Sequence, residues 1–102
     1  MEMEMVMSKS LVICGELFER KKDLELFLKE MLNRYELGDK LNSQDQLFLS
    51  DVLKRHPDAA SKIGCGIESF SVRSAEYGTR CFWVNRLDNS TDKFSFRSCI
   101  YN

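Results

Sequence analysis

The 102-residue sequence predicts an α+β domain, in which an antiparallel sheet of three to four strands is covered on one face by two helices and a short third helix. Two observations carry this prediction. Apolar residues in the first half recur at helical spacing, whereas the second half consists of short runs rich in Phe, Val, Ile and Ser. The stretch from His56 to Ile67 joins the halves, with a proline that favours a helix start and two glycines that favour its end.

The first half begins with a short apolar run, Leu11 to Cys14, which predicts a buried strand that ends at Gly15. A helix is predicted from about Arg20 to Tyr35 and before Gly38, because its apolar residues are three or four positions apart and share one face. These apolar residues are Leu24, Phe27, Leu28, Met31, Leu32 and Tyr35.

A second helix is predicted from Ser43 to Arg55. Ser43 and Gln46 have the spacing of a capping box, in which each side chain bonds the backbone amide of the other residue. His56-Pro57 interrupts this helix, because the residue before a proline is disfavoured in the α region. Pro57 then favours a short third helix, Asp58 to Ile63, which ends at Gly64.

Three strands are predicted in the second half: Ile67 to Arg73, Arg80 to Arg86, and Lys93 to Ile100. Residues 75–78 and 87–91 form the turns between them. If the second turn centres on Asn89, Phe82 faces Phe96 and Val84 faces Phe94 on the core side of the sheet. The opposite side then carries Cys81 opposite Arg97, Trp83 opposite Ser95, and Cys99 diagonal to Cys81.

Length and composition indicate one globular domain over residues 9–102, preceded by a head, residues 1–8, that is expected to be disordered. No run approaches the roughly 20 apolar residues that cross a bilayer, so no membrane association is expected. The head lacks the pattern of a signal peptide, and four cysteines without such a signal fit a reducing compartment. A cytoplasmic location is therefore expected.

The net charge of −1 argues against a strongly electrostatic nucleic-acid binder, but the charge is unevenly distributed. Residues 1–53 hold 7 Lys/Arg and 11 Asp/Glu, a balance of −4, and residues 54–102 hold 8 and 5, a balance of +3. This asymmetry points to an anionic partner on the C-terminal half.

The predicted sheet face that carries Trp83, Arg97, Cys81 and Cys99 is the most suggestive surface. Single-stranded RNA is often bound on an open sheet, with bases stacked on an aromatic ring and phosphates held by arginine. The alternative is that Trp83 lies under a loop, the N-terminal segment or a second subunit.

His56 is the only histidine, and its place before Pro57 favours a capping or hydrogen-bonding role over catalysis. The four cysteines lack the Cys-x2-Cys pairs of structural zinc sites, so free thiols are predicted, with a Cys81–Cys99 disulfide or two-cysteine site as the alternative. Gly64-Cys65-Gly66 lacks the third glycine of a dinucleotide-binding loop and is interpreted as a turn. Neither a cofactor nor a catalytic residue is predicted.

From His56 onward the chain resembles the DCL (Defective Chloroplasts and Leaves) family, and the likeness extends over about residues 38 to 100. The matching positions are His56-Pro57, Lys62-Ile63-Gly64, Gly66-Ile67, Tyr77-Gly78-Thr79-Arg80-Cys81-Phe82, Val84, Arg86, Phe94-Ser95, Arg97 and Cys99-Ile100. The resemblance implies an RNA-associated, non-enzymatic module, because plant members are linked to plastid ribosomal RNA processing and a similar domain ends the largest subunits of plant-specific RNA polymerases. The plant members also carry a transit peptide, which is not seen here.

These observations lead to the hypothesis of a non-enzymatic accessory domain that binds RNA or a ribonucleoprotein, related to ribosomal RNA processing. The alternative is a protein-interaction or self-association module that uses the same sheet face. An enzyme is disfavoured by the single histidine and by the lack of a clustered carboxylate pair. The predicted binding residues are His56, Lys62, Arg80, Trp83, Arg86 and Arg97.

Overall fold

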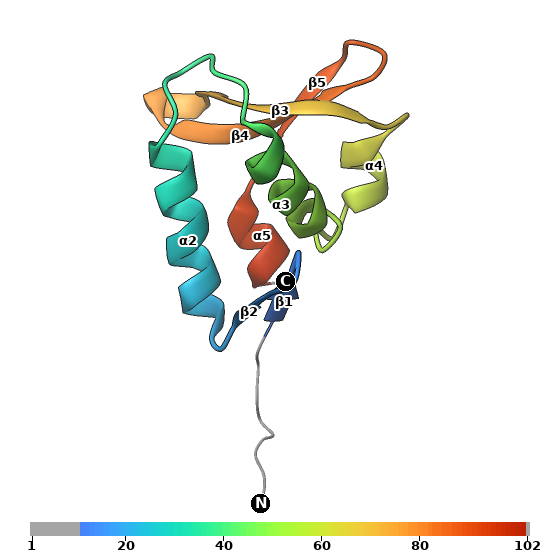
Figure 1. Cartoon of the computed structure of the whole chain (residues 1–102). Coiled ribbons are helices and arrows are strands. Elements are labelled where there is room, and N and C mark those ends of the chain that lie inside the picture. The colour runs from blue at the N-terminus through green and yellow to red at the C-terminus, as the bar shows by residue number, and fades with distance from the viewer. Residues whose placement is uncertain (1–10, 102) are drawn as a thin grey trace, which may run out of the picture.

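The structure is a computed structural model that describes residues 11–101, so the predicted disordered head, residues 1–8, lies outside the described residues. The fold is α+β, as predicted, with a three-stranded sheet, a separate two-stranded hairpin and helices on one side of the larger sheet (Figure 1). The elements are β1 (Leu11–Ile13), β2 (Glu16–Phe18), α2 (Lys21–Asn33), α3 (Ser43–Leu53), α4 (Ala59–Ile63), β3 (Ile67–Ser74), the 3₁₀ turn η1 (Glu76–Gly78), β4 (Arg80–Arg86), β5 (Thr91–Phe94) and α5 (Phe96–Ile100).

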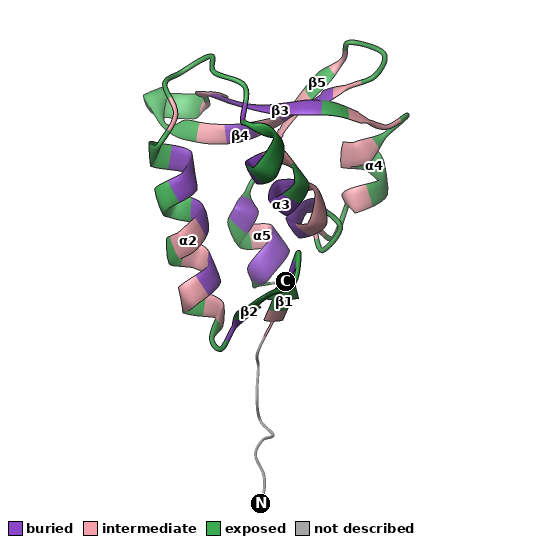
Figure 2. Ribbon diagram, viewed as in Figure 1, coloured by how far each residue is buried: buried purple, intermediate pink, exposed green. Residues whose placement is uncertain are grey.

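The main sheet has the antiparallel order β3-β4-β5. Its inner face is apolar because alternate strand residues point to the same side. This face packs on α2, α3 and α5, whose buried positions are turned toward one another and toward the sheet (Figure 2). The inner-face residues are Phe70, Val72, Phe82, Val84 and Phe94.

A fourth segment covers the outer edge of β3. The Gly38 amide donates to the Val72 carbonyl at 2.7 Å, the Val72 amide donates to the Asp39 carbonyl at 3.0 Å, and the Leu41 amide donates to the Phe70 carbonyl at 3.0 Å. Residues 38–41 therefore act as a short edge strand and satisfy the backbone groups that β3 would otherwise leave unpaired.

The prediction of a single buried strand from Leu11 to Cys14 was only partly right. β1 pairs with β2 in its own hairpin, and the turn Cys14-Gly15 has positive φ at both residues, 51° and 82°. Positive φ at both central residues suits a two-residue hairpin loop. Ile13 is buried, but Val12 is 57% exposed, so only one side of this strand reaches the core.

Helices α2 and α4 confirm the predicted helices, with ends displaced by one or two residues. The predicted capping box at α3 was wrong. Asn42, not Ser43, is the N-cap, and its side chain accepts from the Asp45 amide at 2.8 Å. The Gln46 side chain instead accepts from the Phe70 amide at 2.8 Å and so joins α3 to β3. The sequence pattern could not show this tertiary bond.

The third predicted strand, Lys93 to Ile100, was also wrong in part. β5 covers only Thr91–Phe94, and Phe96–Ile100 forms α5, whose Phe96, Cys99 and Ile100 are buried against the other helices. Phe82 consequently faces Phe94, not Phe96. Val84 likewise faces Asp92, not Phe94. The shift is by two residues, so the predicted faces of β4 are preserved, but Arg97 and Cys99, predicted on the outer face, belong to α5.

Within residues 11–101, no helix is long and apolar enough to cross a membrane.

Candidate functional site

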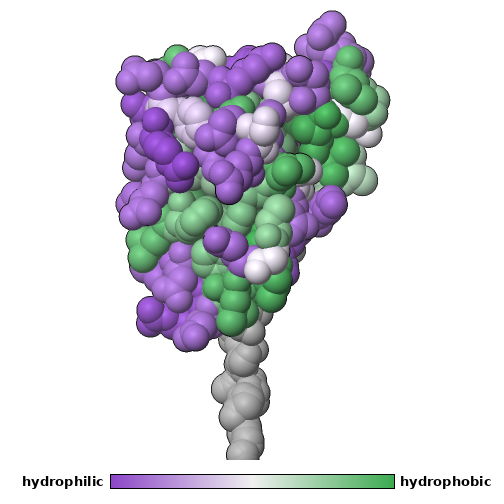
Figure 3. Space-filling view, viewed as in Figure 1, coloured by the Kyte–Doolittle hydropathy of each residue, from purple (hydrophilic) through white to green (hydrophobic). Residues whose placement is uncertain are grey.

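The outer face of the main sheet is the first candidate site. Within the described part of the chain, α2, α3 and α5 lie on the opposite side of the sheet, so no helix covers this face (Figure 1). Its smaller residues, Ser69, Ser71 and Asn85, are nevertheless buried. The upper end of the molecule, over the sheet, is largely hydrophilic in Figure 3. The outer-face residues are Ser69, Ser71, Arg73, Cys81, Trp83, Asn85 and Lys93, as the strand register shows.

A polar network organises this face around Asn85. The Asn85 amide nitrogen donates to the hydroxyl of Ser69 at 3.0 Å and to that of Ser71 at 3.3 Å. Arg73 donates from Nη2 to Asn85 Oδ1 at 2.8 Å and from Nε to Ser71 Oγ at 3.1 Å. Buried polar groups that are all bonded rigidify their surroundings, so this network fixes the Arg73 guanidinium on the sheet.

Trp83 lies between Ser71 and Lys93 in the register and is half-buried. The Arg73 guanidinium carbon lies 5.6 Å from the centroid of its ring, within the range of a cation–π contact. Trp83 Nε1 is buried and has no hydrogen-bond partner among the described residues. A buried, unpaired donor is costly, so this indole N–H would gain a hydrogen bond if a movement of its neighbours admitted an acceptor.

The six predicted binding residues do not share one surface. Trp83 is on the outer face, Arg80 and Arg97 line a cavity beside α2, and His56 and Lys62 line another cavity beside α4. The predicted pairing of Arg97 with Cys81 and of Trp83 with Ser95 was wrong, because Arg97 belongs to α5 and its Nε lies 3.0 Å from Glu25 Oε2.

Arg73 was missed by the sequence reasoning. Its place opposite Cys81, on the same face as Trp83, follows from the β3–β4 register, which the pairing of the last two strands alone did not give. Tyr77 was also missed as a candidate. It is fully exposed in η1 with φ of +62°, a conformation that is rare for a bulky residue.

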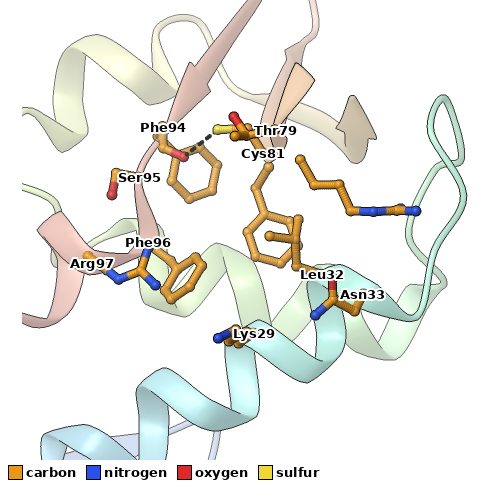
Figure 4. Close-up of a pocket in the computed structure, with 11 residues that line it drawn as sticks. Lys29, Leu32, Asn33, Thr79, Cys81, Phe94, Ser95, Phe96 and Arg97 are labelled. Atoms are coloured by element: carbon orange, nitrogen blue, oxygen red, sulfur yellow. Dashed lines mark hydrogen bonds between the residues drawn. The ribbon is translucent and has the colours of Figure 1, made fainter. Parts of the chain in front are cut away.

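The cavity beside α2 has a volume of about 440 Å³ and lies between α2, β4 and α5 (Figure 4). Phe82, Phe94, Phe96 and Leu32 give it an apolar floor. Its three cationic lining residues are Lys29, Arg80 and Arg97, and its polar ones include Asn33, Thr79 and Ser95.

Two of these cations are held by protein groups. The Arg80 guanidinium donates to the Tyr35 carbonyl, and the Arg97 guanidinium lies 5.0 Å from the centroid of the Phe96 ring while it bonds Glu25. The Tyr101 hydroxyl donates to the same carboxyl at 2.7 Å, and these two bonds hold the pKa of Glu25 below its usual value. The Glu25 carboxylate therefore fixes the orientation of the Arg97 guanidinium.

Arg86 and Lys62 form a staple between α4 and the β4–β5 hairpin. Asp92 Oδ2 lies 3.1 Å from Lys62 Nζ and 3.3 Å from Arg86 Nη2. Arg86 also donates to the carbonyls of Ser61 and Lys62, which are among the last of α4. The structure therefore gives Arg86 a stabilising role at the end of a helix, where carbonyls lack helical partners.

The hydrogen-bonding role predicted for His56 is confirmed, because its Nδ1 accepts from the Asp58 amide at 2.9 Å. Partial burial, followed by the charge of Lys62, lowers the pKa of His56 below its ordinary value. The 490 Å³ cavity that it lines with Lys62 also contains Asp58, Glu76 and Asp92, so its lining charges are mixed.

All four cysteines are free thiols, which was the predicted state, and Cys81 and Cys99 form no disulfide. Burial raises the pKa of Cys99 to about 11 and raises that of Cys81, whose Sγ contacts the Phe94 carbonyl oxygen at 3.3 Å. Among residues 11–101, no group of three His, Cys, Asp or Glu side chains is placed to hold a metal ion.

Comparison with known proteins extends this picture. Residues 29–100 match the family described as "Protein of unknown function (DUF3223)". The structure is similar to the solution NMR structure of an uncharacterized protein from Rhodospirillum rubrum, with a TM-score of 0.86, 50% sequence identity, and coverage of 94% of this chain and 92% of the other.

Relatives of known name are plant proteins. The chain is 35% identical over 78% of its length to DNA-directed RNA polymerase IV subunit 1 of Arabidopsis thaliana, and 39% identical over 59% to Protein EMBRYO DEFECTIVE 514 of the same plant. It is 33% identical over 66% to Protein DCL, chloroplastic, of Solanum lycopersicum. The matched segment spans 6% of the polymerase subunit and 31% of each of the other two proteins. The match over residues 29–100 and these relatives show that the chain belongs to the DUF3223 family, as a small domain of the DCL type.

Proposed function

We propose that this chain is a non-enzymatic accessory domain that binds single-stranded RNA, alone or within a ribonucleoprotein, through the outer face of its main sheet. The observation that carries the proposal is the Trp83–Arg73 pair on an uncovered antiparallel sheet. An aromatic ring beside a guanidinium accepts any base by stacking, and the guanidinium supplies charge for a phosphate.

The unpaired Trp83 Nε1 adds a hydrogen-bond donor to this surface. Because the atom is buried, an acceptor on the RNA reaches it only after a neighbouring side chain moves. Lys93, opposite Trp83 on the neighbouring strand β5, supplies a second cation, although its Nζ also pairs with Glu76 Oε2 at 2.9 Å. The relatives named as RNA polymerase subunits fit a role beside RNA, and ribosomal RNA processing is the finer role that the family resemblance suggests.

The six residues predicted from sequence take different parts in this proposal. Trp83 stacks a base, and Arg80 and Arg97 contact the strand beside it. Lys62 and His56 lie at the β5 side of the sheet, where Lys62 is partly neutralised by Asp92. Arg86 positions α4 and does not contact the RNA.

The test is a titration of the single tryptophan's fluorescence with a short mixed-sequence RNA at 50 and 200 mM salt. We expect saturable quenching, with affinity about tenfold weaker at the higher salt if two or three phosphates are contacted. In an anisotropy assay with labelled RNA, Trp83→Ala is expected to lose about 1–3 kcal/mol of binding free energy, which is the usual contribution of one stacked base.

Arg73→Gln should weaken RNA binding in the same assay, and Lys54→Gln is the matched control, because Lys54 is exposed at the end of α3, away from the sheet face. Equal RNA affinity in the wild type, Trp83→Ala and Arg73→Gln would sink the proposal.

A protein-interaction module is the alternative, and one observation favours it: a half-buried tryptophan with an adjoining arginine is also typical of an interface anchor. Sedimentation at rising concentration separates the two. A dimer that Trp83→Ala abolishes, in a protein that does not bind RNA, would support the alternative.

A further inference from the structure

The cavity beside α2 differs in charge from three other cavities within residues 11–101. Its lining contains three cationic side chains and no carboxylate. The others each contain at least one acid: Glu16 and Asp45 in one, Glu68 in the second, and Asp58, Glu76 and Asp92 in the third. A low-dielectric wall with one sign of charge concentrates counter-ions of the opposite sign, so this cavity favours an anion.

Two of its cations are free to contact a ligand. Within the described residues, Lys29 and Arg80 make no ion pair, and the Arg80 contact with the Tyr35 carbonyl leaves further N–H groups of its guanidinium for an acceptor. Arg97 is shared with Glu25, so its net contribution to an anion is smaller. An anion here meets about two uncompensated positive charges.

The apolar residues that line this cavity favour an anion that also has a flat or apolar part. Phe96 lies under the Arg97 guanidinium and contacts Phe82 edge-on at 6.1 Å between centroids, and both rings are buried, so they form the base of the cavity beneath the cations. Figure 4 shows the Phe96 ring, Lys29, Leu32 and Asn33 around the same opening. A cavity of about 440 Å³ is larger than inorganic phosphate needs, whereas a nucleotide would fill it and contact both the cations and the apolar residues.

The cavity also adjoins the outer face. Cys81 lines the cavity, and on β4 it is two residues from Trp83 on the same face, a separation of about 7 Å along a strand. The cavity is therefore within reach of a nucleotide next to one that stacks on Trp83.

We infer that this cavity binds one nucleotide of the RNA strand, with its base on the Phe96 side and its phosphate between Lys29 and Arg80. The inference rests on the proposed function and deepens it, because it adds a nucleotide pocket to the stacking surface. Lys29 and Arg80 are the anion-binding residues, and Arg97 with Phe96 forms the wall against which the base lies.

The test is an NMR titration of the ¹⁵N-labelled chain with uridine 5′-monophosphate, with uridine, and with an eight-nucleotide oligouridylate. We expect saturable shifts of the amides of Cys81, Ser95 and Arg97 with the monophosphate, and at least tenfold weaker binding of uridine. Lys29→Gln should weaken the monophosphate three- to tenfold. Lys54→Gln, on α3, is the control and should leave its affinity unchanged.

The outcomes separate this inference from the proposed function. Loss of RNA affinity in Trp83→Ala, with neither monophosphate binding nor an effect of Lys29→Gln, would overturn the pocket and leave the stacking surface intact. A monophosphate that binds as tightly as the octamer would also overturn it, because the ligand would then be a free nucleotide. An octamer that binds at least tenfold more tightly, and whose affinity depends on both Lys29 and Trp83, would support the inference.

Discussion

Gly64 and Arg86 approach so closely that no side chain fits between them. A Cβ built on Gly64 would lie 2.9 Å from Cδ and 3.0 Å from Nε of Arg86. Gly66 has the same relationship with Leu87, at 2.7 Å from Cδ1. The two glycines of the Gly-Cys-Gly stretch therefore let the end of α4 pack against Arg86 of β4 and Leu87 after it.

Gly64→Ala is expected to lower the free energy of unfolding by about 3 kcal/mol. The substitution forces φ of +58° with ψ of −127° on a residue with a Cβ, and it displaces Arg86 from the α4 carbonyls. Urea denaturation would measure the loss. Gly38→Ala is the matched control, because Gly38 also has positive φ but nothing within 4 Å of its Cβ position, and about 1 kcal/mol is expected there. Equal losses in the two variants would show that the contact with Arg86 contributes nothing.

Since Asn42 caps α3, substitutions of Asn42 and of Ser43 should have different effects on stability. Asn42→Ala should cost about 1 kcal/mol, because the Asp45 amide loses its acceptor. Ser43→Ala should change the free energy of unfolding by less than about 0.5 kcal/mol. Thermal unfolding of both variants would measure the two losses of stability. A larger loss in the Ser43 variant would support the predicted capping box in place of the Asn42 cap.

The four thiols should react at rates that follow their exposure and pKa. Cys14 and Cys65 are exposed, whereas burial raises the pKa of Cys99 to about 11 and so suppresses its thiolate at pH 8. Alkylation of the native protein, followed by peptide mass spectrometry, should modify Cys14 and Cys65 first and Cys99 last. Denatured protein should show four comparable rates. Early modification of Cys99 in native protein would contradict its buried place in α5.

His56 should make stability depend on pH between about 7.5 and 5.5. Its pKa in the fold lies below the ordinary value of 6.5, because partial burial and the Lys62 charge disfavour the imidazolium. A lowered histidine pKa means that the unfolded chain binds more protons, so this contribution is complete above pH 6.5 and is lost as the pH falls from there through the folded pKa. Urea midpoints at pH 7.5 and 5.5 should therefore fall more in the wild type than in His56→Asn. Parallel falls would assign the effect to other groups.

Tyr77 combines full exposure with φ of +62°. Tyr77→Asn should raise the free energy of unfolding by about 0.5–1 kcal/mol, because asparagine tolerates this conformation better. Differential scanning calorimetry would measure the change. A stabilised variant with weaker RNA binding would mean that the tyrosine is retained for contact with the ligand. Unchanged RNA affinity would mean that the RNA does not extend to η1.

The sequence was sufficient for the elements whose signals are local. The spacing of Leu24, Leu28 and Met31 predicted α2, and the alternation in β4 predicted which side chains face the core. The five-residue run of α5 was ambiguous, because Phe96, Cys99 and Ile100 fit a strand end as well as a short helix, and only packing against α2 and α3 decides between them.

The candidate site was predicted less completely, because its members come from separate elements. The predicted pairing of the last two strands placed Trp83 on the correct face, although its partner is Lys93 and not Ser95. Arg73 required the β3–β4 register, and the grouping of Lys29 with Arg80 required the position of α2 beside β4. Charge counts of the two halves could not show that Lys29 of α2 and Arg80 of β4 line one cavity.

The edge segment at residues 38–41 also restricts how this domain can associate by strand addition. Since it already bonds the backbone of Phe70 and Val72, an incoming peptide or second copy cannot pair with β3 at these residues. Within residues 11–101 the remaining open edge of the main sheet is that of β5, only four residues long. A strand added to the main sheet at this edge would pair along Thr91–Phe94, and it would lengthen the Trp83 face instead of covering it.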